Sequence, residues 1–180
     1  MKKIDRRSFI KKTSLSSASL YMASNLACSE DYEKTPSSGS YMGDFAAPKL
    51  QVVRIAIIGL GARGSGHAKQ LGTIEGTEIV ALVDIYEDLV NKSVSSCMDI
   101  SRGRHQNIAR YFGDENQWKK MLIEVEPDAV IIATNWKNHA KMAIEAMKQG
   151  AHAFVEVPIA VTLEEMWEII NTSEQTQKHC

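Results

Sequence analysis

The sequence predicts an α/β protein built around a doubly wound parallel β-sheet. Three observations favour this fold: short apolar runs rich in β-branched residues, helix-compatible segments between those runs, and a glycine-rich turn directly after the first run. Short apolar runs are typical of strands buried on both faces. Their alternation with helices is typical of a parallel sheet. We expect this folded domain to span residues 50–180.

The first part of the domain has the order strand, glycine turn, helix, strand, acid. An apolar run over 52–58 ends in Gly59–Gly64, a G-x-G-x-x-G pattern. A helix is expected from about Ser65 to Thr73, and a second strand over 78–83 ends at Asp84. This order is the Rossmann dinucleotide-binding fingerprint. A chance glycine turn is the alternative for the motif alone, and the flanking strands and the placed acid argue against it.

Each glycine of the motif has a physical role. Gly59 allows a tight turn out of the strand, Gly61 lets the backbone approach a pyrophosphate, and Gly64 lets helix and strand pack closely. The free N–H groups at the start of the helix favour the negative diphosphate. The turn is therefore the predicted site for the centre of a dinucleotide.

Asp84 indicates which dinucleotide is bound. It lies 20 residues after Gly64, at the tip of the second strand, where a carboxylate can accept hydrogen bonds from both adenosine-ribose hydroxyls. The same carboxylate would repel a 2′-phosphate, and no Arg or Lys follows until Lys92. We therefore predict NAD rather than NADP as the cofactor.

The rest of the domain continues the alternation. Strands are expected over 109–112, 129–133 and 152–155, and helices over 87–100, 116–125, 138–149 and 163–176. Thr162 and Glu165 form a capping-box pattern at the start of the last helix. Gly150 suits the end of the preceding one.

Two further segments are expected at the carboxyl edge of the sheet, where ligands of such folds bind. After the fourth strand, Trp136 offers a flat face and His139 a titratable group beside the nicotinamide half of the cofactor. The alternative is that Trp136 only covers the start of a helix and that His139 is a surface residue. After the fifth strand, Glu156 either binds a ribose hydroxyl or satisfies local backbone donors.

The glycine turn, the Ala133-Thr134-x-x-x-x-His139 segment and the Glu156-Val157-Pro158 segment together resemble the Gfo/Idh/MocA sugar oxidoreductases. In most of that family a lysine stands between the Glu and the Pro and assists hydride transfer at a sugar carbinol. Here Val157 occupies that position, which places ordinary dehydrogenase chemistry in doubt.

Within the same fold, Gly-Leu-Gly-x-Arg-Gly, Trp-Lys-x-His and Val-Glu-Val-Pro resemble glycoside hydrolase family 109, the NAD-dependent α-N-acetylgalactosaminidases. The resemblance implies transient oxidation of the sugar at C3 by NAD, elimination of the glycosidic oxygen, addition of water and return of the hydride. It also implies a set of cofactor contacts, namely Ala62, Arg63, Asp84, Trp136, His139, Glu156 and Val157.

The resemblance further implies a second α/β domain that supplies the sugar-binding residues and a catalytic His and Tyr. We expect no catalytic residue among residues 1–180, because those residues would come after Cys180. Two alternatives to the glycosidase stay open: an NAD-dependent sugar or inositol oxidoreductase, and a dinucleotide-binding module without catalysis.

Residues 1–28 resemble a twin-arginine export signal. Arg6-Arg7-Ser8-Phe9-Ile10-Lys11 is followed by an uncharged stretch over 13–27 that is too short and too polar for a stable membrane span. Cys28 follows Asn25-Leu26-Ala27, an imperfect lipoprotein box because Leu is usual where Asn25 stands. Lipidation of Cys28 and simple cleavage nearby are the two alternatives, and the expected location is the periplasm or a membrane surface. Residues 29–49 are rich in Ser, Gly, Pro and acids, which predicts a flexible linker.

Charge and cysteine content limit the kinds of partner that we expect for this chain. The chain of 180 residues has a formal net charge of -1. Removal of residues 1–27 takes away six Lys or Arg and one Asp, which leaves -6. An acidic domain without a basic patch argues against nucleic acid. The cysteines show no metal-ligand spacing. The expected partners are an amino-sugar glycan, a lipid anchor at Cys28 and further copies of the chain.

The export signal can be tested directly. Replacing Arg6 and Arg7 together by Lys should leave the protein in the cytoplasm, because the twin-arginine route reads the arginine pair. Cell fractionation followed by immunoblotting measures the distribution, and replacement of Lys2 and Lys3 by Arg is the matched control. Unchanged export of the double-lysine variant would contradict the prediction.

Overall fold

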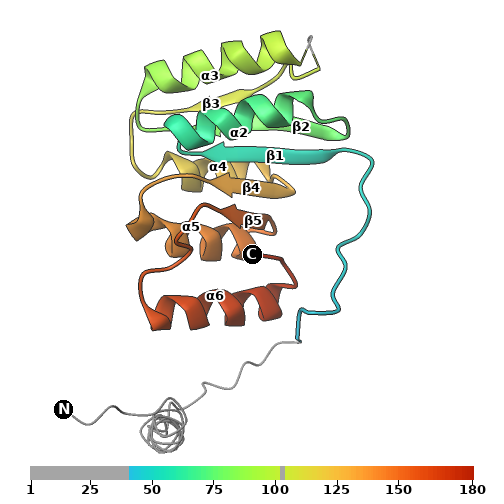
Figure 1. Ribbon diagram of the computed structural model, residues 1–180, viewed down its shortest axis with the longest axis vertical. Helices are drawn as coiled ribbons and strands as arrows, with labels where there is room; N and C mark the ends of the chain where they lie inside the picture. The colour runs from blue at the N-terminus through green and yellow to red at the C-terminus, as the bar shows by residue number, and fades with distance from the viewer. Residues whose placement is uncertain (1–40, 102–103) are drawn as a thin grey trace, which may run out of the picture. The chain divides into compact units, whose positions relative to one another are not determined.

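The computed structural model describes residues 41–101 and 104–180, and these residues form one compact unit. Its strands and helices alternate along the chain (Figure 1). In order they are β1 (Val53–Ile58), α2 (Ala62–Thr73), β2 (Thr77–Val83), α3 (Glu87–Ile100), β3 (Ala109–Tyr111), α4 (Gln117–Val125), β4 (Ala129–Ile132), α5 (Trp136–Lys148), β5 (His152–Val155) and α6 (Leu163–Thr176).

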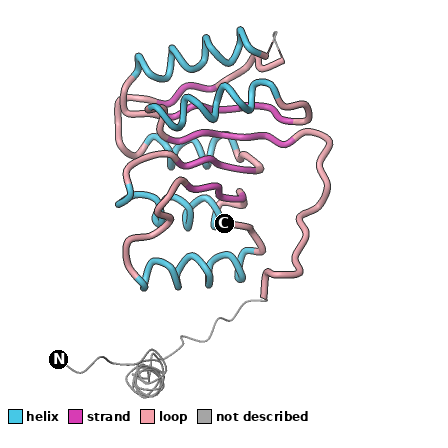
Figure 2. Tube along the Cα trace, in the orientation of Figure 1, coloured by secondary structure: helices cyan, strands magenta, loops and turns pink. Residues whose placement is uncertain are grey.

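The strands form one parallel sheet in the order β3-β2-β1-β4-β5 (Figure 2). The chain moves outward from β1 to β3, then returns and continues outward on the other side from β4 to β5. This reversal of strand order places a crevice between the carboxyl ends of β1 and β4. The predicted doubly wound parallel sheet is confirmed.

Two helices begin earlier than predicted. The helix expected from Ser65 begins at Ala62, so Gly64 is part of it, and the helix expected from Asn138 begins at Trp136. In both cases an extended residue, Gly61 or Asn135, precedes the first helical residue and ends the loop. The remaining boundaries lie within about two residues of the prediction, which is the usual uncertainty of helix and strand ends.

The sheet has a hydrophobic core on each face. On one face, α2 and α3 pack against alternate strand residues, including Ile57 and Leu82. On the other face, α4, α5 and α6 contribute to a larger core that contains Ile58 and Ile132. Because both faces are covered, the central strands are apolar at nearly every position, as the sequence indicated.

The turn from β1 into α2 depends on two of its glycines. Gly59 has a φ of +88°, a conformation that L-amino acids with a side chain rarely adopt. A Cβ atom built on Gly64 would overlap the carbonyl oxygen of Gly59. The absence of a side chain at Gly64 therefore allows α2 to start directly against the end of β1.

The ends of α5 and α6 also follow the sequence. The Thr162 side chain accepts a hydrogen bond from the Glu165 N–H, and the Glu165 side chain accepts from the Thr162 N–H, so the predicted capping box is confirmed. Gly150 has a φ of +91° directly after the Gln149 C-cap. Both features satisfy backbone groups that a helix end leaves unpaired.

The predicted signal over 1–28, with Cys28, and the linker up to residue 40 lie outside the described residues. Residues 41–52 contain no helix or strand. In the described ranges, no helix is long and apolar enough to cross a bilayer, and no three His, Cys, Asp or Glu side chains gather as metal ligands. Cys97 is buried, which raises the pKa of its thiol to about 11 and disfavours the reactive thiolate.

Two helical glycines allow a test of the turn. Gly64→Ala should lower the free energy of unfolding by about 1–3 kcal/mol, because the new methyl group overlaps the Gly59 carbonyl. Gly66→Ala, in the same helix and with open space around its Cβ position, should raise it by about 0.5–1 kcal/mol. Urea denaturation followed by circular dichroism measures both. Equal effects of the two substitutions would contradict this account of the turn.

Candidate cofactor-binding site

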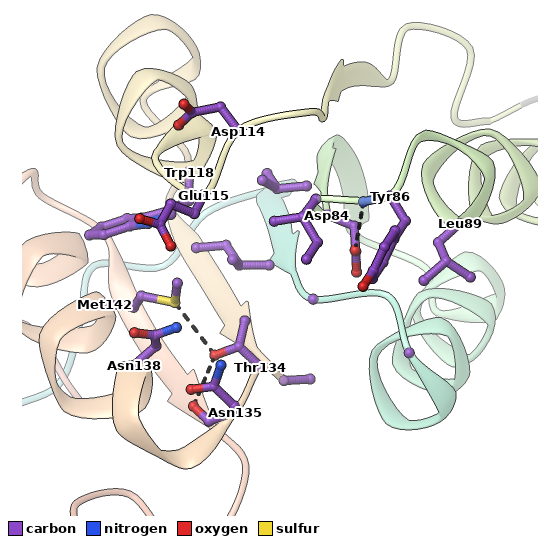
Figure 3. Close-up of a pocket in the computed structure, with 16 residues that line it drawn as sticks. Asp84, Tyr86, Leu89, Asp114, Glu115, Trp118, Thr134, Asn135, Asn138 and Met142 are labelled. Carbon is purple, nitrogen blue, oxygen red and sulfur yellow. Dashed lines mark hydrogen bonds between the residues drawn. The ribbon is translucent and has the colours of Figure 1, made fainter.

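A pocket of about 260 Å³ opens at the carboxyl edge of the sheet, at the reversal of strand order (Figure 3). Asp84 and Tyr86 lie on the side of β2, and the glycine turn forms the floor beside them. Thr134, Asn135 and Asn138 form the opposite wall, and residues 114–118 close a third side. The pocket therefore lies where an α/β sheet of this topology binds its ligands.

Asp84 is held in place by the backbone around it. Its Oδ2 accepts a hydrogen bond of 2.6 Å from the Leu60 N–H, and its Oδ1 accepts one of 3.0 Å from the Tyr86 N–H. Each carboxylate oxygen can accept a second hydrogen bond. Asp84 is half-buried and lines the pocket, so these remaining positions are available to vicinal hydroxyl groups of a ribose.

The start of α2 provides a site for a diphosphate. No side chain caps this helix end, and its first turn contains no acidic residue. The N–H groups of the first turn are therefore available to an anion, and the positive end of the helix dipole favours one. Apart from Gly61 and its two chain neighbours, no protein atom lies within 4 Å of a Cβ position built on Gly61, so a phosphate has room to approach the backbone. Together with Asp84, these features fit a dinucleotide.

Glu156, directly after β5, pairs with two side chains of α2. Its Oε1 lies 2.6 Å from Nε2 of His67, 2.8 Å from Nη2 of Arg63 and 3.0 Å from Nε of Arg63. Hydrogen bonds from His67 and then from Arg63 lower the pKa of Glu156 below its ordinary value. The alternative that Glu156 satisfies local backbone donors is wrong, because its partners are side chains.

His139 is buried, with an exposed fraction of 1%, so the alternative that it is a surface residue is wrong. Its Nδ1 lies 2.8 Å from the Pro158 carbonyl oxygen, and its Nε2 lies 3.1 Å from the Thr134 carbonyl oxygen. The ring thereby joins the segments that follow β4 and β5. His139 does not line the pocket, and its contact with the cofactor stays a prediction.

Trp136 and Val157 are both exposed. Trp136 is the first residue of α5 and is 63% exposed, so it covers little of the helix start. Val157 is 81% exposed and precedes Pro158 through a cis peptide bond. Neither residue lines the pocket, and their assignment as cofactor contacts stays a prediction.

Sequence reasoning missed several residues of the site. Tyr86 follows Asp84 by two residues and could have been found from its place after the strand. Trp118, in the helix predicted over 116–125, was not expected at the site; it is buried and also lines the pocket. His67 was missed, although it follows Arg63 by four residues and therefore lies on the same side of α2.

The fold and the pocket define a Rossmann dinucleotide-binding protein. A family model described as "Oxidoreductase family, NAD-binding Rossmann fold" matches residues 53–180, and the chain belongs to this family, Gfo/Idh/MocA. The predicted NAD-binding fold is thus confirmed.

Curated relatives carry a more specific name. The chain is 47% identical over 145 residues to glycosyl hydrolase family 109 protein 2 of Akkermansia muciniphila, covering 81% of this chain and 30% of that protein. It is 40% identical over 183 residues to the α-N-acetylgalactosaminidase of Shewanella oneidensis, covering 100% of this chain and 39% of that protein. The chain therefore spans well under half the length of these relatives.

Solved structures of the same fold include two inositol dehydrogenases from Lactobacillus casei. The scyllo-inositol dehydrogenase with bound NAD(H) and scyllo-inositol is 23% identical, with a TM-score of 0.59 over 70% of this chain and 34% of that one. The myo-inositol dehydrogenase in complex with NAD(H) and myo-inositol is 28% identical, with a TM-score of 0.57 over 68% of this chain and 33% of that one. The first likeness concerns the fold alone.

Asp84 should control cofactor preference. Asp84→Asn should weaken NAD binding by about 1.5–3 kcal/mol, because the charged acceptor of the ribose hydroxyls is lost. NADP binding should fall much less, because the same change removes repulsion of its 2′-phosphate. Isothermal titration calorimetry measures both ligands. Asp128→Asn is the matched control, since Asp128 also accepts a backbone hydrogen bond, from the Arg54 N–H, and precedes β4 at the opposite edge of the sheet. Equal losses for NAD and NADP would contradict the prediction.

The Glu156 pairing should make stability depend on pH. Because the pKa of Glu156 in the folded protein lies below the ordinary 4.5, its stabilising effect is fully present above that value. The effect is lost as the pH falls through the lowered pKa. Denaturation midpoints of the wild type and Glu156→Gln should therefore differ at about pH 7, and the difference should shrink as the pH falls below 4.5. Glu75→Gln, at an exposed turn, is the control, and a difference that persists at low pH would contradict the prediction.

Proposed function

We propose that this chain is the NAD-binding part of a glycosidase that hydrolyses terminal α-N-acetylgalactosamine. The observation that carries the proposal is the identity of 38–47% with relatives named glycosyl hydrolase family 109 or α-N-acetylgalactosaminidase. Val157 supports it, because the resemblance to sugar oxidoreductases implies a lysine at this position, and an aliphatic side chain stands there instead.

The chain's own residues bind and orient the cofactor in this proposal. Asp84 accepts hydrogen bonds from the adenosine ribose, and the first turn of α2 faces the diphosphate. Glu156 accepts a hydrogen bond from the ribose on the nicotinamide side. When bound, NAD supplies a hydride acceptor for transient oxidation of the sugar. Val157 can neither give nor take a proton, so the residue after Glu156 contributes no acid or base to the reaction.

A sugar or inositol oxidoreductase is the second candidate. The observation in its favour is the 28% identity with the myo-inositol dehydrogenase of Lactobacillus casei. The two candidates differ in the fate of the hydride: a glycosidase returns it within each cycle, whereas a dehydrogenase releases NADH. Net NADH production therefore distinguishes them.

The proposal extends to partners and location. In export through the twin-arginine route, the chain would cross the membrane with its cofactor already bound. Cys28 is the candidate for a lipid anchor. The segment from β5 to α6 exposes apolar side chains, namely Phe154, Val157, Val161, Leu163, Met166 and Ile170. Such a surface favours association with another part of a longer chain or with a second copy.

A chimera tests the proposed activity. Residues 50–180 are joined to the part of the Shewanella oneidensis enzyme that follows its matched region. We expect release of the aglycone from a chromogenic α-N-acetylgalactosaminide without net NADH, measured by absorbance at two wavelengths. The 180-residue chain alone should bind NAD and release no aglycone, because no catalytic residue is expected within it.

Two controls make the result specific. The chimera with Asp84→Asn should need more NAD for half-maximal activity, which ties the reaction to this site. The intact Shewanella enzyme provides the reference rate. Accumulation of NADH with free sugars, and no cleavage of the galactosaminide, would favour the oxidoreductase and contradict the proposal.

A further inference from the structure

The role of His67, a side chain near the carboxyl edge, follows neither from the glycine motif nor from the family resemblance. It lies on α2, one helical turn after Arg63, with its side chain 27% exposed. Its Nε2 approaches Oε1 of Glu156 to 2.6 Å, which joins α2 to a residue 89 positions further along the chain. This contact links the helix at the diphosphate site with the end of β5.

The two partners of Glu156 approach the same oxygen atom. Nε2 of His67 and both Nε and Nη2 of Arg63 lie within 3.0 Å of Oε1. In the part of the chain that the structure describes, Oε2 forms no hydrogen bond. The carboxylate is thus fixed through one oxygen, and the other is left available to a ligand.

The backbone of Glu156 is fixed as well. Its N–H donates a hydrogen bond of 2.9 Å to the carbonyl oxygen of Ile132, which extends the pairing of β5 with β4 by one residue. With a fixed backbone and a held Oε1, the position of Oε2 is largely determined. It lies at the carboxyl end of β5, on the opposite side of β1 from Asp84 and the adenosine half of the site. The two halves of this fold bind the two nucleotides of the cofactor, so Glu156 belongs to the nicotinamide half.

Arg63 and His67 differ in how firmly they can hold Glu156. Arg63 stands in the first turn of α2, its side chain is 73% exposed, and a bound diphosphate would offer its guanidinium a second anion. His67 lies one turn deeper and is better covered. It can therefore keep its contact with Glu156 when Arg63 turns toward a phosphate.

We propose that His67 is a positioning residue that holds Oε1 of Glu156, so that Oε2 accepts a hydrogen bond from the ribose on the nicotinamide side of the bound dinucleotide. The proposal rests on NAD binding at this edge and not on the glycosidase activity. Hydrogen bonds from His67 and then from Arg63 also lower the pKa of Glu156, which keeps it an acceptor at neutral pH.

Ligands of increasing length test the proposal on the 180-residue chain. AMP covers the adenosine half, ADP-ribose adds the second ribose, and NAD adds the nicotinamide. By calorimetry, His67→Leu should weaken ADP-ribose and NAD binding by about fivefold to tenfold, the scale of one hydrogen bond. AMP affinity should change by less than about twofold. His67→Gln, which retains a side-chain N–H donor, should recover most of the loss.

Three further variants separate the proposed role of His67 from an effect on folding. Glu156→Gln should reproduce the loss for ADP-ribose, and the double variant with His67→Leu should lose little more, because the two residues act as a unit. Gln70→Leu, at an exposed position of the same helix, should leave all three affinities unchanged. If His67→Leu does not fold, His67→Ala, which also removes the donor, takes its place in the cycle with Glu156→Gln.

Three results would overturn the proposal. One is unchanged ADP-ribose affinity in His67→Leu, and another is an equal loss for AMP, which would indicate a general disturbance of α2. The third is full additivity of His67→Leu and Glu156→Gln. If the wild type bound neither AMP nor NAD, the cofactor site itself would be wrong. Failure of the chimera to cleave a galactosaminide would leave this result unaffected.

Discussion

The close contact between Gly59 and Gly64 is the constraint on which the rest of the structure depends. Because Gly64 has no side chain, α2 begins against the carbonyl of Gly59, directly after β1 ends. This start brings the free N–H groups of α2 to the reversal of strand order between β1 and β4. It also sets the direction in which Arg63 and His67 leave the helix toward Glu156. A longer turn at this point would move the start of α2 away from Asp84 and Glu156.

Most of the fold follows from local patterns. Strands β1, β2 and β4 are short apolar runs because helices cover both faces of the sheet, and this pattern predicts them directly. Asp84 and the glycines were found because their roles depend on sequence spacing. The shift in register between β1 and β2 after Ile55 was not predicted, since it depends on how two separate strands fit together.

The rest of the site could not be derived from spacing. His139 is buried because segments after β4 and β5 meet around its ring, and this contact depends on the order of strands in the sheet. The pairing of His67 with Glu156 joins residues far apart in the chain, which no local pattern reveals. The flat aromatic side chain of Trp136 suggested a ligand contact. Its place at the start of α5 leaves it exposed beside the pocket.

The two halves of the carboxyl edge are built by different means. On the adenosine side, Asp84 is held by backbone N–H groups within the same βαβ unit, so the position of its carboxylate depends little on other side chains. At the carboxyl ends of β4 and β5, Glu156 is held by side chains of α2, and His139 bridges two loops through backbone carbonyls. Substitutions can therefore alter the second half without altering the first. In the proposed function the reaction occurs on this second side, where the exposed Val157 stands in place of the lysine that the resemblance to sugar oxidoreductases implies. On this proposal, one adenosine site can serve enzymes whose reactions differ, because the residues near the reacting atoms are positioned separately from Asp84.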